Sequence, residues 1–197
     1  MSDTPPNRPP KLDPRARRTR DKLGDALVAL VQERAFESIT VQDVLDRAGV
    51  ARSTFYAHYQ DKDDLFQSDA DDFFQHFARA PIAPGPDGPR VAPVRELLEH
   101  VASARGFFDA VVAAGKHHDL LELGRGHFAR AIAERFASEP RAANLGEVER
   151  EELGHALAGA LFALLLAWMR DPARRPAAEV DARFHALVWA GVGGRAS

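Results

Sequence analysis

Apolar residues recur at intervals of three and four positions along most of this chain, which is the spacing of one face of an α-helix. Leu23, Leu27, Leu30 and Val31 show the pattern near the N-terminus, and the same spacing returns until the chain ends. The helices predicted from this spacing cover residues 13–34, 41–47, 52–59, 61–79, 94–114, 116–137, 147–170 and 177–192. No alternating pattern long enough for a strand competes with them, so the sequence predicts an all-α protein.

Two segments lack the helical spacing. Residues 1–12 are rich in proline and polar residues and are predicted to be a disordered arm. Residues 80–93 contain "PIAPGPDGPRVAP", with five prolines, and are predicted to be a linker between domains. The first domain would span residues 13–62, with the helix at 61–79 as the connection, and the second would span residues 94–197.

The short helices after residue 40 have the local signals of a helix-turn-helix. Thr40 and Asp43 have the spacing of a capping box, with Asp in place of Glu. Gly49 can adopt the left-handed backbone that the following turn needs. Two short helices joined by a turn of this kind place the second helix in the DNA major groove, with its N-terminal residues leading.

The stretch "ARSTFYAHYQDKDDLF", residues 51–66, has the side chains that such a second helix requires. Phe55 and Tyr59 are four positions apart and are predicted to pack inward. Arg52 and Ser53 lead the helix, and an arginine there can donate two hydrogen bonds to guanine. Further hydrogen-bond donors suited to phosphate groups follow at Thr54, Tyr56, His58 and Lys62.

The longer stretch "TVQDVLDRAGVARSTFYAHYQDKDDLF" resembles the DNA-binding region of the TetR (tetracycline-repressor-like) family of bacterial transcriptional regulators, and the resemblance extends over about residues 15–77. It implies an all-α homodimer whose N-terminal helices read a near-palindromic DNA operator. By position, the expected base contacts are Gln42, Arg52 and Ser53. The expected phosphate contacts are Thr54, Tyr56, His58, Lys62, Arg17 and Arg18.

The resemblance also implies that the C-terminal domain binds a small-molecule effector and forms the dimer. Candidate pocket residues, chosen as aromatic or polar groups in the core helices, are Phe107, Phe108, His117, Phe128 and Phe162. Candidate dimer residues in the last two helices are Leu157, Leu161, Leu164, Trp168, Leu187 and Trp189. Small residues such as Gly154 would let partner helices approach closely. A ligand-released repressor is the family's usual behaviour, and no cofactor is expected besides the effector.

Composition narrows this interpretation. The 197 residues include no cysteine, which excludes disulfides and thiol chemistry. The N-terminus lacks the apolar region of a signal peptide, and the longest apolar run, residues 160–169, is shorter than a membrane span, so a cytoplasmic protein without a membrane partner is expected. The net charge is −3, yet residues 8–22 are strongly basic, which favours a local contact with a polyanion.

Two alternatives belong to other classes. Histidines near residues 115–127 and aspartates at residues 61–72 could indicate a metal site or an enzyme, but neither cluster has metal-ligand spacing or a nucleophile–base pair. We therefore expect neither a metal nor an enzymatic activity. A DNA-binding protein without sequence preference is the other alternative, and the modest overall charge disfavours it.

Overall fold

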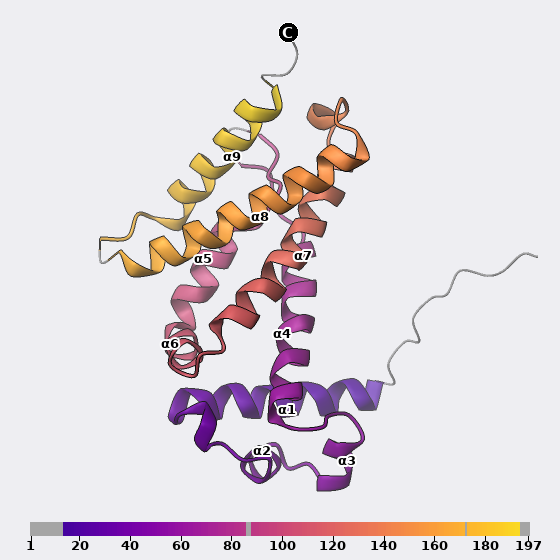
Figure 1. Ribbon diagram of the computed structural model, residues 1–197, viewed down its shortest axis with the longest axis vertical. Coiled ribbons are helices and arrows are strands. Elements are labelled where there is room, and N and C mark those ends of the chain that lie inside the picture. The colour runs from indigo at the N-terminus through magenta and orange to yellow at the C-terminus, as the bar shows by residue number, and fades with distance from the viewer. Residues whose placement is uncertain (1–13, 86–87, 172, 194–197) are drawn as a thin grey trace, which may run out of the picture. The chain divides into compact units, whose positions relative to one another are not determined.

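The structure is a computed structural model that describes residues 14–85, 88–171 and 173–193. Over these residues the chain is all-α, as predicted, and its β-structure there is limited to an isolated bridge between Gly85 and Gly88 (Figure 1). The elements are α1 (Pro14–Glu33), η1 (Phe36–Ser38), α2 (Val41–Ala48), α3 (Arg52–Tyr56), α4 (Lys62–Arg79), α5 (Val94–Ser103), α6 (Arg105–Ala113), α7 (His117–Ser138), η2 (Pro140–Ala142), α8 (Glu147–Arg170) and α9 (Ala177–Gly193), where η denotes a 3-10 helix. The predicted arm at residues 1–12 lies outside the described residues.

The chain divides into two compact units, Met1–Phe66 and Gln67–Ser197. The first unit contains α1, η1, α2, α3 and the first residues of α4. Its core is apolar and almost fully buried, and consists mainly of Leu23, Leu27, Val31, Phe36, Ile39, Val44, Leu45, Phe55 and Leu65. Leu23, Leu27, Val31 and Phe55 are positions that the helical spacing assigned to inner faces, whereas Phe36 and Ile39 lie between the predicted helices.

The local signals of the first unit act as predicted, except at the end of α3. The Thr40 hydroxyl accepts a hydrogen bond from the Asp43 amide (3.2 Å), and the Asp43 carboxylate accepts one from the Thr40 amide (2.8 Å), which completes the capping box. Gly49 ends α2 with φ of 63°. The helix α3 ends at Tyr56 instead of residue 59, yet the Tyr59 amide still donates to the Phe55 carbonyl (2.9 Å), so the four-residue spacing survives in a turn.

The prediction of a linker at residues 80–93 is wrong. The boundary between the units lies after Phe66, inside α4, and the proline-rich segment belongs to the second unit. Val91 and Ala92 are buried there, and the Arg135 guanidinium donates to the carbonyls of Val91 (3.3 Å) and Ala80 (3.0 Å). Prolines prevent a helix, but they do not decide whether the resulting irregular segment is packed or exposed.

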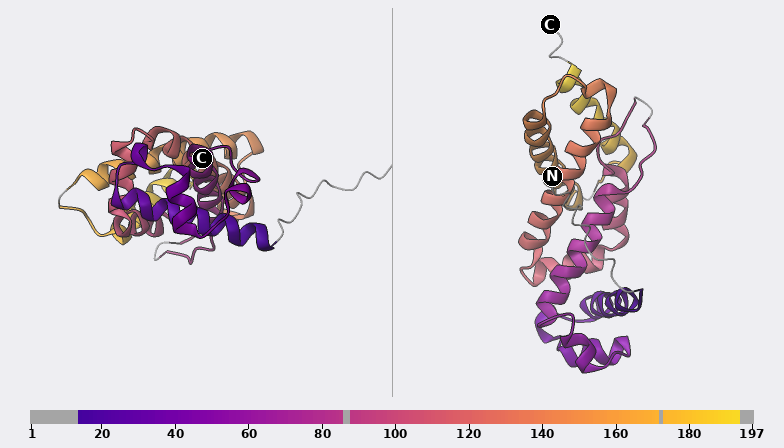
Figure 2. Two further views of the ribbon diagram at one scale, coloured as in Figure 1. Left: turned by 90° about the horizontal axis from the view of Figure 1, so that it is seen from below. Right: turned by 90° about the vertical axis from the view of Figure 1, so that its right-hand side faces the viewer.

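The second unit is built around α7 and α8, which pack along each other (Figures 1 and 2). Gly154 of α8 makes this approach possible, because a Cβ atom there would lie 2.5 Å from the Ala129 carbonyl oxygen of α7. Gly154 therefore allows a close contact between two helices of the same chain, whereas the sequence suggested a contact with a helix of the partner. The helix predicted over residues 94–114 is two helices, α5 and α6, which meet at Ala104. Alanine favours helices, so no local signal predicted this break.

Candidate nucleic-acid interface and apolar cavity

The exposed face of α2 and α3 brings together three of the predicted DNA contacts. The Arg52 guanidinium donates to the Gln42 side-chain oxygen (3.5 Å) and to the Tyr56 hydroxyl (3.4 Å), and it lies 5.5 Å from the centre of the Tyr56 ring. Gln42 also donates to Asp46 (2.8 Å). All of these hydrogen bonds are at the surface, where the same donors can be exchanged for base or phosphate acceptors.

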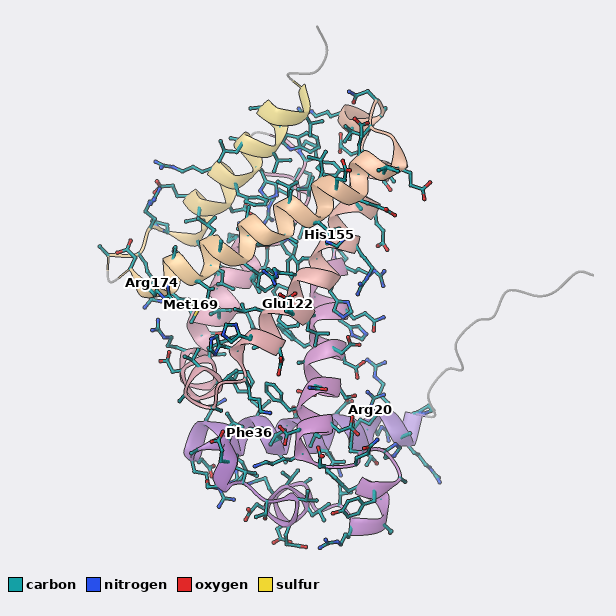
Figure 3. The ribbon with its side chains drawn as sticks, in the orientation of Figure 1. Arg20, Phe36, Glu122, His155, Met169 and Arg174 are labelled. Atoms are coloured by element: carbon teal, nitrogen blue, oxygen red, sulfur yellow. The ribbon has the colours of Figure 1, made fainter. Side chains whose placement is uncertain are left out.

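The opposite side of α3 fixes this face in place. Phe55 is 0% exposed and Tyr59 is 5% exposed, so both aromatic rings pack inward as predicted. The Tyr59 hydroxyl accepts a hydrogen bond from Arg20 of α1 (3.0 Å; Arg20 is labelled in Figure 3). Because one side of α3 is held by the core and by α1, the residues on its other side have a defined orientation.

The remaining predicted contacts in the first unit are at the surface, with two exceptions. Ser53 and His58 are exposed, and Arg17 and Arg18 are exposed on α1. Thr54 is half-buried. These positions are compatible with contact to DNA, through a base for Ser53 and through phosphates for the others, and these roles remain predictions.

Lys62 is the second exception, because its ammonium group is bonded within the first unit; its predicted phosphate contact stays a prediction. Its ammonium group donates to the carbonyls of Phe36 (2.6 Å) and Ile39 (2.8 Å) and lies 4.6 Å from the centre of the Phe36 ring. Lys62 therefore caps the C-terminal end of η1. The sequence did not predict η1, so these acceptors could not be anticipated.

A group of ion pairs joining α1 to α2 was also missed. Arg34 bonds to Asp43 (2.9 Å), and Arg47 bonds to Glu33 through both of its terminal nitrogens (2.9 and 2.7 Å). Hydrogen bonds from Thr40, helped by Arg34, lower the pKa of Asp43 to about 2. These residues are charged and mostly exposed, so the sequence alone does not distinguish them from unpaired charges on a solvated helix face.

The second unit contains an apolar cavity of about 40 Å³ that is lined by residues of α4, α5, α6, α7 and α8. Three of the predicted pocket residues, Phe108, His117 and Phe162, line it. Two do not. Phe128 is 0% exposed in the core, where its ring packs edge-on against Phe162, and Phe107 lies outside the lining. The other lining residues are Phe74, Leu97, Val101, Val111, Val112, Leu120, Leu121, Leu165, Leu166 and Met169, the last of which is labelled in Figure 3.

His117, which lines the cavity, has one polar atom without a protein partner. Nδ1 of His117 is buried, and no hydrogen-bonding group of the described residues reaches it. Phe74 is the cavity residue that α4 contributes. The helix α4 begins at Lys62 in the first unit, so one continuous helix extends from that unit to the cavity wall. Sequence reasoning missed Phe74, since its helical position marked it as an ordinary core residue.

The predicted dimer residues divide into two groups. Leu187 is 76% exposed, and Leu157, Leu164 and Trp168 are half-buried, so all four have area for a partner. Leu161, however, is 0% exposed, so assigning it to a dimer surface was wrong.

Trp189 also faces inward. Its indole N–H donates to the Pro89 carbonyl (2.7 Å), and its ring packs edge-on against Phe136. Both Leu161 and Trp189 lie on the sides of α8 and α9 that meet the rest of the second unit, which periodicity alone could not distinguish from the outer sides.

An apolar groove of about 330 Å³ lies between α8 and α9. Its lining consists of Leu145, Leu153, Leu157, Ala160, Phe184, Leu187, Val188, Gly191 and Val192. Helix α8 is also the single described helix that is long and apolar enough to span a membrane, with a mean hydropathy of 1.6 over a window that is only 28% buried. One helix of this length and composition is weak evidence for a membrane span, because core helices of other proteins pass the same test.

No group of three or more potential metal ligands occurs among the residues that the structure describes. His127, His100 and His155 have separate surroundings. His127 pairs with Asp71 (2.7 Å), the His100 ring stacks on Phe73, and His155 lies exposed on α8 (Figure 3).

A buried ionic network in the second unit was not predicted. Arg90 donates to Asp181 of α9 (2.7 Å) and forms two hydrogen bonds with Glu96 of α5 (2.9 and 2.5 Å). Those bonds lower the pKa of Glu96 to about 2. Burial lowers the pKa of His185, whose Nε2 faces the Ala92 amide at 3.4 Å. The network joins the proline-rich segment to both helices.

Comparison with known proteins supports the resemblance. The family model described as "Bacterial regulatory proteins, tetR family" matches residues 23–68, which include α2, α3 and the start of α4. An uncharacterized HTH-type transcriptional regulator, YxbF of Bacillus subtilis, is 24% identical over 177 residues. That match covers 85% of this chain, but the chain spans only 44% of the relative's length.

Solved structures share the fold at low identity. A TetR transcriptional regulator from Streptococcus agalactiae aligns over 88% of this chain and 95% of its own, with a TM-score of 0.58 and 21% identity. The dihydroxyacetone kinase operon activator DhaS aligns over 88% and 96%, with a TM-score of 0.62 and 17% identity. The TetR family repressor AlkX from a Dietzia strain, implicated in n-alkane biodegradation, aligns over 94% and 98%, with a TM-score of 0.60 and 17% identity. The helix-turn-helix with its capping box, glycine turn and exposed arginine lies within residues 23–68, so this segment is similar in sequence to the DNA-binding region of TetR-family regulators, and the described chain shares their fold.

Proposed function

We propose that this chain is a homodimeric repressor that binds a near-palindromic operator in the bacterial cytoplasm and is released from it by a small molecule. The observation that carries the DNA-binding part is the exposed group formed by Gln42, Arg52 and Tyr56 on α2 and α3. The donors of this group lie on the surface of the first unit, whose core is apolar. A guanidinium at the start of the second helix of a helix-turn-helix can donate two hydrogen bonds to guanine.

The dimer is supported by the apolar area that α8 and α9 leave uncovered. Leu187 is 76% exposed beside a groove of about 330 Å³, and a water-soluble chain rarely leaves such a patch without a partner. A second copy would cover the same residues on both chains, and its twofold axis would match two DNA half-sites.

Response to a ligand is supported by the cavity and by the continuity of α4. Phe74 contacts the cavity, while Lys62, at the start of the same helix, is bonded to η1 in the DNA-binding unit. A ligand that changes the position of α4 can therefore change the equilibrium between DNA-binding and non-binding conformations, to the extent that it binds one of them more tightly. We propose that the protein represses transcription, although the structural relatives include an activator and a repressor.

The test begins with selection of DNA sites from random and genomic fragments by the purified full-length protein. A repressor of this kind enriches one near-palindromic sequence, and its affinity for that site exceeds its affinity for random DNA by about a thousandfold or more. Equal affinity for all fragments would instead show a DNA-binding protein without sequence preference. Transcription from a promoter containing the selected site, with and without the protein, then determines the sign.

A further inference from the structure

We infer that the effector is a small, mostly apolar molecule with a single hydroxyl group, and that this hydroxyl binds Nδ1 of His117. The inference rests on the proposed ligand response and names the chemistry of its site. The cavity wall is almost entirely hydrocarbon, because His117 is the one lining residue among the thirteen with a nitrogen or oxygen in its side chain.

The unpaired nitrogen limits what can bind. A buried polar atom without a partner is unfavourable, and Nδ1 of His117 is the one such side-chain atom found among the described residues. A purely apolar ligand would leave it unpaired, while a ligand with several polar groups would bury groups that the hydrocarbon wall cannot satisfy. A molecule with one hydrogen-bonding group avoids both costs.

A hydroxyl fits better than a group that only donates or only accepts. Depending on the tautomer of His117, Nδ1 is either an N–H donor or a lone-pair acceptor. A hydroxyl can serve as partner in both cases. A charged group is disfavoured, because no opposite charge lines the cavity.

The size of the cavity adds a conformational requirement. About 40 Å³ is well below the roughly 300–1,000 Å³ of ligand pockets, so a wall must move when an organic molecule binds. Helix α6 is the weakest wall, because Val111 is its one buried residue and Val112 is 50% exposed. Gly115 follows it with φ of 69°, in a turn that precedes His117. Ligand size therefore determines how far α6 is displaced.

The test compares two probes of nearly the same shape, phenol and toluene, up to millimolar concentrations. Binding to the full-length protein is measured by calorimetry and by the shift in unfolding temperature. Phenol should bind about tenfold more tightly than toluene, because only its hydroxyl pairs with Nδ1. In His117→Leu the preference should disappear or reverse, while His118→Leu, which changes the exposed neighbour, should keep it.

A second variant locates the site independently of His117. A methyl group added at Gly124 would lie 2.5 Å from the Phe162 ring and 2.9 Å from the Phe74 ring, so both rings must shift within the cavity wall. Gly124→Ala should therefore weaken both probes by similar factors. Unfolding curves of the variants without probe establish that they are folded.

Three results would overturn the inference: equal affinity of the wild type for both probes, an unchanged preference in His117→Leu, or no binding of either probe. None of them bears on DNA recognition, which is measured separately with the selected operator. If another compound releases the protein from DNA with equal potency from wild type and His117→Leu, ligand response stands and the role of His117 is wrong. If no compound releases it, the proposed ligand response itself fails.

Discussion

Arg52 is the residue on which we propose that sequence-specific recognition depends. Its guanidinium is exposed and weakly bonded to Gln42 and Tyr56 at 3.5 and 3.4 Å, so little is lost when it turns to a base. Arg52→Ala should weaken binding to the selected operator by about 1–3 kcal/mol and leave binding to random DNA nearly unchanged. Fluorescence anisotropy with both DNAs measures the difference. Arg17→Ala is the control, since loss of a phosphate contact should weaken both complexes alike. A similar loss on both DNAs for Arg52→Ala would contradict base reading.

Lys62 shows why an amino-acid type in a familiar position does not determine its role. Its two short bonds to the Phe36 and Ile39 carbonyls make it part of the fold. Lys62→Met keeps the apolar stem but leaves two carbonyls without their charged donor, which should lower the free energy of unfolding by about 1–3 kcal/mol. The salt dependence of DNA binding should stay as in the wild type. Urea unfolding and salt titrations provide the two measurements.

The matched control for Lys62 is Arg18→Met on α1. Arg18 is exposed, so its loss should leave stability unchanged and flatten the salt dependence by about one unit of slope if it contacts phosphate. A Lys62→Met protein of normal stability with a flattened salt dependence would restore the phosphate role that the sequence suggested.

At the scale of elements, the packing of α7 on α8 depends on one glycine. A methyl group at Gly154 would meet a backbone carbonyl at 2.5 Å, and backbone cannot move aside as a flexible side chain can. Gly154→Ala should therefore lower the free energy of unfolding by about 1–3 kcal/mol, despite alanine's higher helix propensity. Gly126→Ala, where the nearest contact is an ordinary 3.7 Å, should be neutral or stabilising by up to about 1 kcal/mol. Denaturant unfolding of both variants measures the difference in their free energies of unfolding. Equal stability would show that α7 and α8 can move apart to accommodate the methyl group at no cost.

The junction of the proline-rich segment with α5 and α9 depends on ionised carboxylates. In the folded protein the pKa of Glu96 is about 2, against 4.5 as its ordinary value, because Arg90 holds its charged form. A lowered folded-state pKa means that this stabilisation is complete above about pH 4.5 and is lost as the pH falls toward 2. We expect Glu96 to contribute about 1–2 kcal/mol to this loss, allowing for its partial exposure.

Urea unfolding at a series of pH values measures that contribution. Glu96→Gln should be less stable than the wild type at neutral pH and should lose less stability on acidification. Glu99→Gln changes an exposed carboxylate on the same helix and should follow the wild-type curve. Parallel curves for Glu96→Gln and the wild type would show that the Arg90 network does not depend on ionised Glu96.

At the scale of the whole molecule, the proposed function requires a second copy of the chain at the apolar surface of α8 and α9. Leu187 lies 76% exposed beside the groove between α8 and α9, and a charge there would be buried in a dimer without a partner. Leu187→Glu should be monomeric at concentrations where the wild type is a dimer, and it should bind the operator at least about tenfold more weakly, because two half-sites are no longer bound together. Sedimentation and operator titration are the measurements.

Gln75→Glu adds the same charge at an exposed position of α4 and serves as the control for Leu187→Glu. It should remain dimeric. A dimeric Leu187→Glu protein with wild-type operator affinity would place the interface elsewhere on the chain.

The sequence alone determined what depends on neighbours along the chain: the helical class, the capping box at Thr40, the turn at Gly49, the inward direction of Phe55 and Tyr59, and the exposed face led by Arg52. These features follow from backbone geometry and from spacings of three and four residues, which one helix or turn fully specifies. The same signals located the helix-turn-helix, which lies within the residues 23–68 that the family model matches.

Only the tertiary structure decided what depends on residues distant in sequence. It turned Lys62 inward onto η1, buried the segment around Val91 that had been predicted as a linker, and assigned Leu161 to the core instead of the dimer surface. It also placed Phe74 beside His117, across 43 positions of sequence, in one cavity. Helical spacing predicts that an apolar residue is buried, but it does not predict which part of the chain packs against it. That depends on how the helices pack together, which residues close in sequence do not determine.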